Sequence, residues 1–255
     1  MIRYNKIPIL EFDSDREAKI TAASFLNKIL PEYCVISFFK EAINKIVKRK
    51  NSRIIGYLHS EIVDIPIYEL DIHGKRICIT MPFATAPGAA GTIEELHAMG
   101  VEKFIVCGAA GCLCSELEVG NLILPVSAVR DEGTSYHYLE PSREVTCDPF
   151  ALQTVKQLLK DMSVPYVEGK TWTTDAFYRE TAEKIKRRVS EGCITVEMEC
   201  AAFYAVAKFY NLPLVQILYA GDNLDCEKWD CRNWKQQYSI RENIVNLALE
   251  IVGGL

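Results

Sequence analysis

One segment of the chain can form only a helix that is buried on every side. Apolar and small residues cover all faces of a helix over Ala201–Ala207, so none of its faces suits water. Glu197, Met198 and Glu199 come directly before it. By the spacing of three and four residues, Glu199 shares a face with Phe203. We therefore expect an acid that points inward at the start of a buried helix.

A buried carboxylate is costly unless hydrogen-bond donors surround it, and a helix N-terminus supplies only part of what Glu199 needs. A sugar diol is one ligand that would donate two hydrogen bonds to this acid. A buried arginine or backbone amides of the protein itself would satisfy it equally well. The residues alone leave both readings open.

Apolar runs alternate with helical patterns along most of the chain. The runs predict strands at Ile7–Phe12, Arg76–Met81, Lys103–Ala109, Asn121–Val129, Tyr166–Thr173 and Pro213–Ala220. The helical patterns cover Ser14–Leu30, Phe39–Lys50, Ala89–Met99, Asp148–Asp161, Ala182–Val189, Val196–Tyr210 and Asn233–Val252. Such alternation predicts an α/β fold in which helices flank a mixed, mainly parallel central sheet. No linker or repeat divides the chain, so we expect a single layered domain over residues 1–255.

Composition restricts the partners of this domain. A net charge of −5 argues against a nucleic-acid surface, which needs basic patches. No apolar run reaches the roughly 20 residues that a membrane span requires. The ten cysteines show no zinc-like spacing, so we expect no metal site and a reducing, cytoplasmic location.

Two further segments could hold a ligand. In Gly108-Ala109-Ala110-Gly111, which follows an apolar run, small side chains would let a ligand approach the backbone, although a tight packed turn explains them as well. Arg130 opens a loop of charges, hydroxyls and aromatics that reaches Tyr138. That loop could cover a pocket, make a subunit contact or be plain surface.

Phe177 and Tyr178 lie at a junction between a strand and a helix, where two aromatics could stack on a planar base or close the edge of the core. Asp222 follows the last buried strand. An acid there could act as a general acid if burial raises its pKa, or could serve as a turn residue or helix cap.

Taken together, these segments resemble the nucleoside phosphorylase family of bacterial-type purine nucleoside phosphorylases and uridine phosphorylases. The resemblance runs from about Ile7 to Asp222. The motifs that carry it are Thr92-Ile93-Glu94-Glu95-Leu96, Gly108 with Gly111, Asp131-Glu132-Gly133-Thr134-Ser135, Phe177-Tyr178 and Val196-Glu197-Met198-Glu199. It implies that Glu199 holds the ribose hydroxyls while Met198 packs on the sugar. It also implies that Glu197 lies near the base, that Phe177 stacks on the base with Tyr178 alongside, and that Asp222 protonates the base. The Ala109-Ala110-Gly111 backbone would line the substrate.

The chain departs from this family where phosphate should bind. The Gly-Asp-Pro-x-Arg loop of the family corresponds to Phe12–Arg16 in our comparison, and only the arginine remains. Val106 stands where the family carries an arginine, and Ala109 where it carries a hydroxyl. Phe83–Pro87 replaces a glycine-rich turn. The candidate phosphate contacts that remain are Arg16, Gly108 and Arg130.

The resemblance implies an enzyme that needs no cofactor, with inorganic phosphate as co-substrate, and a homodimer or homohexamer. Two features favour a purine ribonucleoside. One is the presence of Asp222, and the other is that Thr181 and Glu183 stand where uridine phosphorylases bind uracil with a glutamine and an arginine. Three alternatives stay open: a nucleosidase that uses water, with Glu11 or Asp13 as general base; a uridine phosphorylase; and an inactive relative that binds nucleosides as a sensor.

Overall fold

The computed structural model describes residues 4–24 and 26–255. Its strands are β1 Tyr33–Ser37, β2 Arg53–Leu58, β3 Ile65–Ile72, β4 Lys75–Thr80, β5 Lys103–Cys112, β6 Leu122–Asp131, β7 Glu144–Thr146, β8 Val167–Thr174, β9 Cys193–Glu197 and β10 Leu214–Asn223. Its α-helices are α1 Lys40–Arg49, α2 Thr85–Ala98, α3 Pro149–Asp161, α4 Ala182–Ser190, α5 Cys200–Tyr210 and α6 Tyr238–Ile251. Short 3₁₀ turns include η1 Pro8–Leu10, η2 Ala22–Ser24, η3 Ser135–His137, η4 Phe177–Arg179, η5 Trp234–Gln236 and η6 Val252–Gly254.

The strands form one mixed sheet with a parallel centre. Parallel pairing joins β4, β1, β5 and β10, and a second parallel run joins β6, β8 and β9. Antiparallel pairs connect the two runs, because β9 also pairs with β5 and β10 also pairs with β6. Strands β5, β10, β6, β8 and β9 therefore close on themselves in a ring. The expected α/β fold with a mixed central sheet is confirmed.

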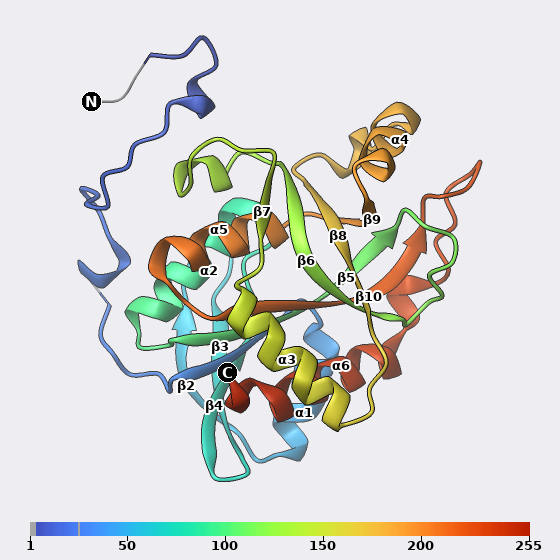
Figure 1. The fold of residues 1–255 in the computed structure, drawn as a ribbon. Helices are drawn as coiled ribbons and strands as arrows, with labels where there is room; N and C mark the ends of the chain where they lie inside the picture. The colour runs from blue at the N-terminus through green and yellow to red at the C-terminus, as the bar shows by residue number, and fades with distance from the viewer. Residues whose placement is uncertain (1–3, 25) are drawn as a thin grey trace.

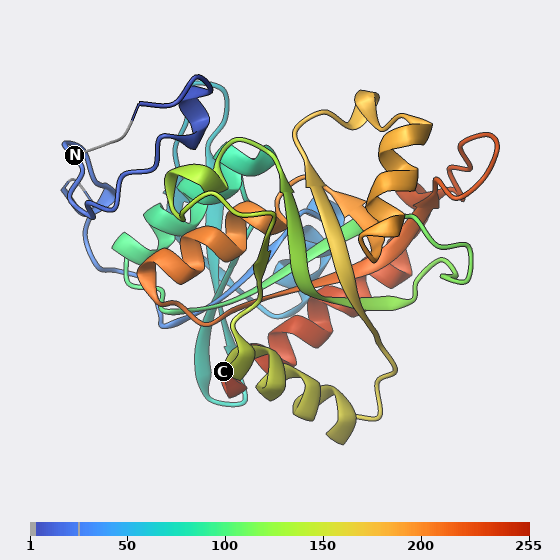
Figure 2. The ribbon, with the colours of Figure 1, turned by 45° about the horizontal axis from the view of Figure 1, so that its top comes forward.

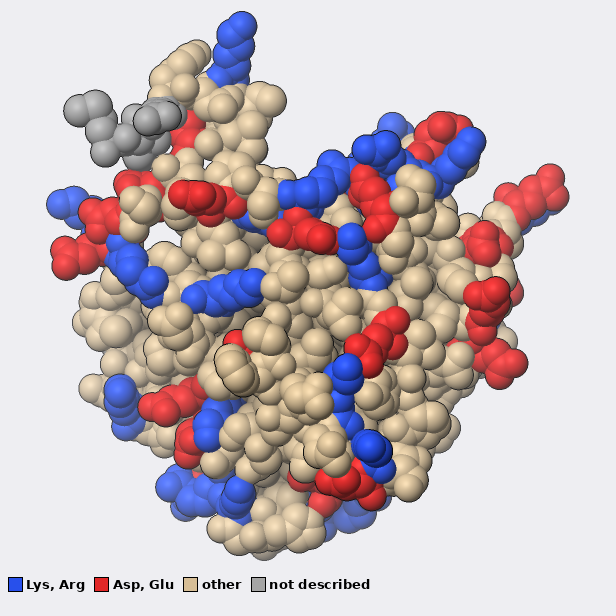
Figure 3. All heavy atoms as spheres, viewed as in Figure 1, with Lys and Arg blue, Asp and Glu red and all other residues tan. Residues whose placement is uncertain are grey.

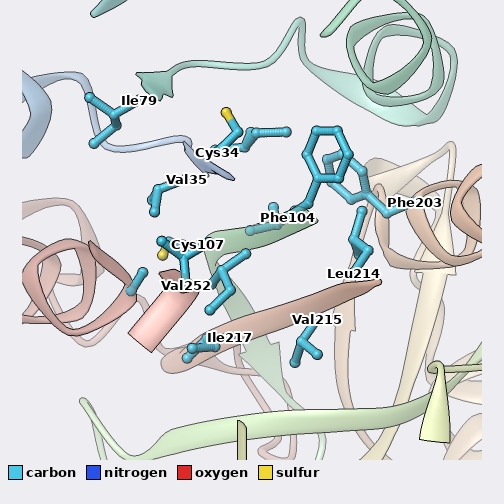
Figure 4. Packing of buried hydrophobic residues seen from close by; sticks show 14 of the residues in the cluster. Cys34, Val35, Ile79, Phe104, Cys107, Phe203, Leu214, Val215, Ile217 and Val252 are labelled. Carbon is cyan, nitrogen blue, oxygen red and sulfur yellow. The ribbon is translucent and has the colours of Figure 1, made fainter. Parts of the chain in front are cut away.

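Helices pack against this sheet. Helix α6 packs on α1 and on β5, and α5 packs on α2 and β6 (Figure 1). Every residue of α5 from Cys200 to Ala207 is buried, as its composition predicts. Phe203 of α5 packs near Phe104 and Leu214 of the sheet (Figure 4). On the face drawn in Figure 3, acidic and basic side chains are interspersed around the rim.

The N-terminal predictions were wrong. Ile7–Phe12 is not a strand: the residues around Pro8 form the 3₁₀ turn η1. The described residues 14–24 and 26–30 form no α-helix; they run as an arm beside α2 with one 3₁₀ turn (Figure 2). The reason is local, because the side chains of Asp13 and Asp15 accept hydrogen bonds from the backbone amides two residues further on. Such turns compete with helix formation.

Several other elements differ from the sequence predictions. The first buried strand is β1, which we did not predict, and β2 and β3 were also missed. Helix α5 begins at Cys200, whereas we placed its start at Val196, because Val196 and Glu197 end strand β9. Of the two explanations for Gly108–Gly111, the tight turn is excluded, since these residues continue β5 to Cys112.

Candidate functional site

Glu197, the last residue of β9, caps the start of helix α5 with its side chain, two residues before the N-cap residue Glu199. Its Oε2 accepts hydrogen bonds from the amides of Glu199 at 2.7 Å and Cys200 at 2.6 Å, and its Oε1 accepts one from the Thr173 hydroxyl at 2.6 Å. Thr173 Oγ1 in turn accepts the amide of Ala201 at 2.9 Å. These bonds satisfy amides that a helix start leaves unpaired, which explains why α5 begins only at Cys200. Burial, and then the charge of Glu199, raise the pKa of Glu197 to about 8 against the effect of its donors.

Glu199 is buried to a similar degree but has far fewer partners. Glu199 is 9 % exposed. Its Oε1 accepts one hydrogen bond, from the Thr85 amide at 2.9 Å. In the described part of the chain, Oε2 accepts no hydrogen bond and the carboxylate forms no salt bridge. Burial raises the pKa of Glu199 to about 7, opposed by the amides of Thr85 and Met198. This acid therefore lacks donors that a buried carboxylate needs.

The contact with Thr85 holds an unusual backbone in place. Thr85 has φ of +72°, a left-handed conformation that β-branched residues rarely adopt. It opens helix α2, and its amide points at Glu199. Backbone strain of this kind persists only where the surrounding structure enforces it, often at functional sites.

Glu199 faces a cavity of about 590 Å³, here called the Arg241 lobe. Its wall includes Phe38, Lys40, Gly108, Glu199, Gln216 and Arg241. A second cavity of about 550 Å³, the Asp222 lobe, is lined by Gly111, Phe177, Tyr178, Glu180, Asp222 and Trp229, among others. Both lobes share Glu197, Met198, Trp234 and Lys235. They are adjoining parts of one cleft, and Met198 lies where they meet.

The Asp222 lobe combines acids with aromatic rings. Asp222 Oδ2 accepts a hydrogen bond from the indole N–H of Trp229 at 2.6 Å. Burial, and then the charge of Asp222, raise the pKa of Glu180 to about 7. The rings of Phe177 and Tyr178 lie 4.1 Å apart between centroids, and Phe177 is 48 % exposed. A planar ligand could stack here while the acids contact its polar edge.

The structure brings most of the predicted substrate residues to this cleft. Gly108 and Ala109 line the Arg241 lobe, and Gly111 lines the Asp222 lobe. A Cβ on Gly111 would lie 2.5 Å from Leu224 Cδ1 and 3.6 Å from Asp222, so a larger side chain there would disturb the lobe. Ala110 differs, since it packs in a small apolar cluster and lines neither lobe.

Neither arginine that we predicted for phosphate lies at the cleft. Arg130 is buried, and its guanidinium donates to Ser135 Oγ at 2.8 Å, to Glu140 O and Ser142 Oγ at 2.7 Å each, and to Leu139 O at 3.1 Å. It therefore holds the loop that follows β6 and lines neither lobe. This prediction is corrected, because the protein already occupies the donors of Arg130.

Arg16 also lies elsewhere. Its guanidinium donates to Phe209 O and packs 4.4 Å from the centroid of the Phe209 ring. Phe209 is in the last turn of α5, about 15 Å along the helix from Glu199 at 1.5 Å per residue. Glu11, a candidate base for hydrolysis, accepts the Asn5 amide at 2.8 Å and lines neither lobe.

Sequence reasoning missed several residues of the cleft. Phe38 and Lys40, at the short connection between β1 and α1, line the Arg241 lobe, whereas none of the residues Phe12–Arg16 lines either lobe. The apolar run Cys34–Ile36, directly before a predicted helix, was the signal that could have located this connection. No comparable pattern in the sequence indicated Glu180, Trp234 or Arg241.

Among the described residues, no group of three or more His, Cys, Asp or Glu could hold a metal ion. No described helix is both long and apolar enough to span a bilayer.

Comparison with known proteins agrees with this geometry. Residues 32–250 match the sequence profile of the phosphorylase superfamily. The chain belongs to this superfamily. Its members act on N-glycosyl bonds, as phosphorylases or as nucleosidases.

Individual relatives of the chain differ in substrate. A guanosine phosphorylase of Halorubrum lacusprofundi is 32 % identical over 151 residues, which cover 59 % of this chain and 63 % of the relative. The match thus spans less than two thirds of that relative. The solved uridine phosphorylase of Vibrio fischeri superposes with a TM-score of 0.75 at 20 % identity, covering 95 % of this chain and all of that one. An AMP nucleosidase of Bacteroides thetaiotaomicron gives a TM-score of 0.67 at 20 % identity, covering 88 % and 89 % of the two chains. The two structural likenesses show the shared fold.

Proposed function

We propose that this protein is a nucleoside phosphorylase that cleaves a purine ribonucleoside with phosphate to give the free base and ribose 1-phosphate. The observation that carries the proposal is Glu199, which lines the Arg241 lobe and whose Oε2 accepts no hydrogen bond from the described residues. A ribose placed there supplies the missing donors through its 2′ and 3′ hydroxyls. Charge-assisted hydrogen bonds of this kind are among the stronger ones in proteins.

The two lobes fit the two sides of such a reaction. With the sugar on Met198 and Glu199, the base occupies the Asp222 lobe, where Phe177 and Tyr178 stack on it. The acceptor enters from the Arg241 lobe on the other side of the sugar. The bond between C1′ and the base nitrogen breaks, a bond from C1′ to a phosphate oxygen forms, and the base leaves with a proton. In this proposal Asp222, which lines the same lobe, hydrogen-bonds or protonates the leaving base, which gains negative charge in the transition state.

Preference for a purine rests on the acids of the Asp222 lobe. Asp222 and Glu180 both line it, and an acid can donate to a ring nitrogen or accept from an N–H. Residues Thr181 and Glu183 offer no glutamine–arginine pair for uracil. The relative named above that is a guanosine phosphorylase fits this preference.

Hydrolysis is the second candidate. It is favoured by one observation, namely that Arg16 and Arg130 do not line the cleft and leave water as a possible acceptor. A single assay separates the two reactions: incubation with inosine, guanosine, adenosine and uridine, with and without phosphate. Ribose 1-phosphate formed only with phosphate supports our proposal. Free ribose formed without phosphate supports a nucleosidase, and binding without turnover supports a sensor.

We further propose a homodimer or homohexamer in a reducing, cytoplasmic location. The ten cysteines form no disulfide in the structure, which suits such a compartment. Exposed apolar surface at Trp229, on the segment between β10 and α6, is a candidate contact between subunits. Light scattering after size-exclusion chromatography tests the assembly, and a monomer at micromolar concentration would refute it.

A further inference from the structure

Arg241 of α6 is a buried cation without an acidic partner. The residue is 8 % exposed and lines the Arg241 lobe. Its Nε donates to Tyr219 Oη at 3.1 Å, and its Nη2 donates to Trp234 O at 2.9 Å. Within the described residues, Nη1 makes no hydrogen bond and the guanidinium forms no salt bridge. An uncompensated buried charge is costly, so this arginine needs an anion or another role that justifies its burial.

The other two buried arginines have protein partners around their guanidinium groups, although Arg188 Nε has no hydrogen-bond partner among the described residues. Arg188 forms salt bridges with Asp131 at 3.0 Å and Glu191 at 3.2 Å. Arg130 donates to four oxygen atoms, as described above. Arg241 differs from both because its remaining donors face a cavity. Its guanidinium lies 5.2 Å from the ring centroid of Phe39 and 5.5 Å from that of Trp234. These contacts orient the guanidinium but do not neutralise its charge.

A second observation comes from Gln216, which lines the same lobe. Gln216 is 1 % exposed, and its Oε1 has no hydrogen-bond partner. A buried acceptor without a donor calls for a bound molecule that the protein does not itself supply. Monoprotonated phosphate and water both carry a donor for such an oxygen.

The charges around the lobe permit an anion. Lys40 and Lys235 line it together with Arg241, while Glu41, Glu197 and Glu199 are its acids. Burial raises the pKa values of Glu197 and Glu199 to about 8 and about 7, which reduces their negative charge near neutral pH. Glu41 lies on the exposed first turn of α1.

We propose that Arg241 is the oxyanion-binding residue of this cleft and that its ligand is a phosphate group. This deepens the proposed function and rests on it for the source of the ligand. In phosphorolysis the source is inorganic phosphate; if the substrate is a nucleotide, it is the phosphate of that nucleotide. Arg241 takes over the role that we had predicted for Arg16 and Arg130.

Calorimetric titration of inorganic phosphate into the full chain, without nucleoside, tests the proposal apart from turnover. A charge-assisted hydrogen bond contributes about 1.5–3 kcal/mol, so Arg241→Gln should weaken phosphate binding roughly tenfold or more. Arg241→Lys keeps the positive charge but loses the paired N–H donors of the guanidinium, so its phosphate affinity should lie between those of the wild type and Arg241→Gln. The matched control is Arg49→Gln, because Arg49 is exposed and its partner Glu242 directly follows Arg241. This control should bind phosphate as the wild type does.

Each outcome decides the proposal. Phosphate affinity that is equal in wild type and Arg241→Gln overturns it, as does the absence of phosphate and inosine 5′-monophosphate binding to the wild type. Arg241-dependent binding of the nucleotide alone assigns the site to a substrate phosphate and contradicts phosphorolysis. Phosphate-dependent turnover with a phosphate KM unchanged by Arg241→Gln overturns the role of Arg241 and leaves the proposed function intact. If Arg241→Gln does not fold, mass-spectrometric mapping of phenylglyoxal modification on the wild type decides: phosphate must protect Arg241.

Discussion

Glu197 and Glu199 are two residues apart at the same helix start, yet the protein satisfies only the first. Glu197 accepts three hydrogen bonds, one of them from the amide of Glu199 itself, whereas Glu199 accepts one. Both residues are largely buried, at 7 % and 9 % exposure. We infer that Glu197 serves the fold and Glu199 serves a ligand.

The variant Glu199→Ala tests whether Glu199 serves a ligand rather than the fold. Because its proposed partner is the substrate, we expect at least a hundredfold loss of kcat/KM with a change in unfolding free energy within about 1 kcal/mol. Assays with purine nucleosides and urea denaturation measure the two effects. A stability loss of several kcal/mol would mean that protein groups hold Glu199.

Glu197→Ala should give the opposite pattern of stability. Its removal leaves the amides of Glu199 and Cys200 and the Thr173 hydroxyl without their acceptor in a buried setting. We expect a loss of about 2–4 kcal/mol in unfolding free energy, from a lost cap and unsatisfied donors. Urea denaturation of this variant beside Glu199→Ala measures the contrast. Equal stabilities of the two variants would contradict the assignment of Glu197 as the cap.

Stability should depend on pH through the same acids. The folded-state pKa of Glu199 is raised to about 7, above its ordinary value of 4.5, so the folded state binds this proton more tightly than the unfolded chain. Its contribution is therefore most favourable below pH 4.5 and is lost as pH rises toward 7. In Glu199→Gln this loss is absent, and the stability of the variant relative to wild type should increase from pH 5 to pH 8. A constant difference across this range would show that Glu199 is not perturbed.

Asp222→Asn tests the preference for purines. If Asp222 assists departure of a purine, the variant should lose inosine and guanosine cleavage by about a hundredfold, within the range typical of general acids. Any uridine cleavage should stay within a few-fold of wild type, because a uracil has no nitrogen equivalent to the purine N7. The ratio of kcat/KM values for inosine and uridine measures this selectivity. Equal losses on both substrates would remove the reason for preferring purines.

Much of the fold could be predicted because it rests on local patterns. The burial of α5 followed from its uniformly apolar faces. The predicted helix Asp148–Asp161 matches α3, which begins directly after Asp148, and the Asp148 side chain accepts the Ala151 amide at 2.7 Å. The predicted helix end at Met99 lies one residue beyond the end of α2, next to Gly100, which has φ of +116°. Each of these depends on residues within one turn of each other.

The predictions failed where local turns compete with regular secondary structure, or where a contact joins residues far apart in the sequence. The patterns at Ile7–Phe12 and Ser14–Leu30 resembled a strand and a helix, but this arm packs too little apolar surface, and the turns of Asp13 and Asp15 replace helical hydrogen bonds. Within the candidate site, Glu199 was predictable from its helix, whereas Arg241 was not. Arg241 meets Tyr219 and Phe39 only because α6 packs across β10 and β1, and no spacing in the sequence encodes that contact.

The central claim is that the Glu199 carboxylate binds ribose hydroxyls. The most direct measurement compares kcat/KM for inosine and 3′-deoxyinosine in wild type and Glu199→Ala, so that the intrinsic reactivity of the two substrates cancels. We predict that loss of the 3′ hydroxyl costs the wild type at least about tenfold more than it costs the variant, as expected when a charge-assisted hydrogen bond is removed. An identical penalty in both enzymes would show that Glu199 does not contact the sugar, and would contradict the account.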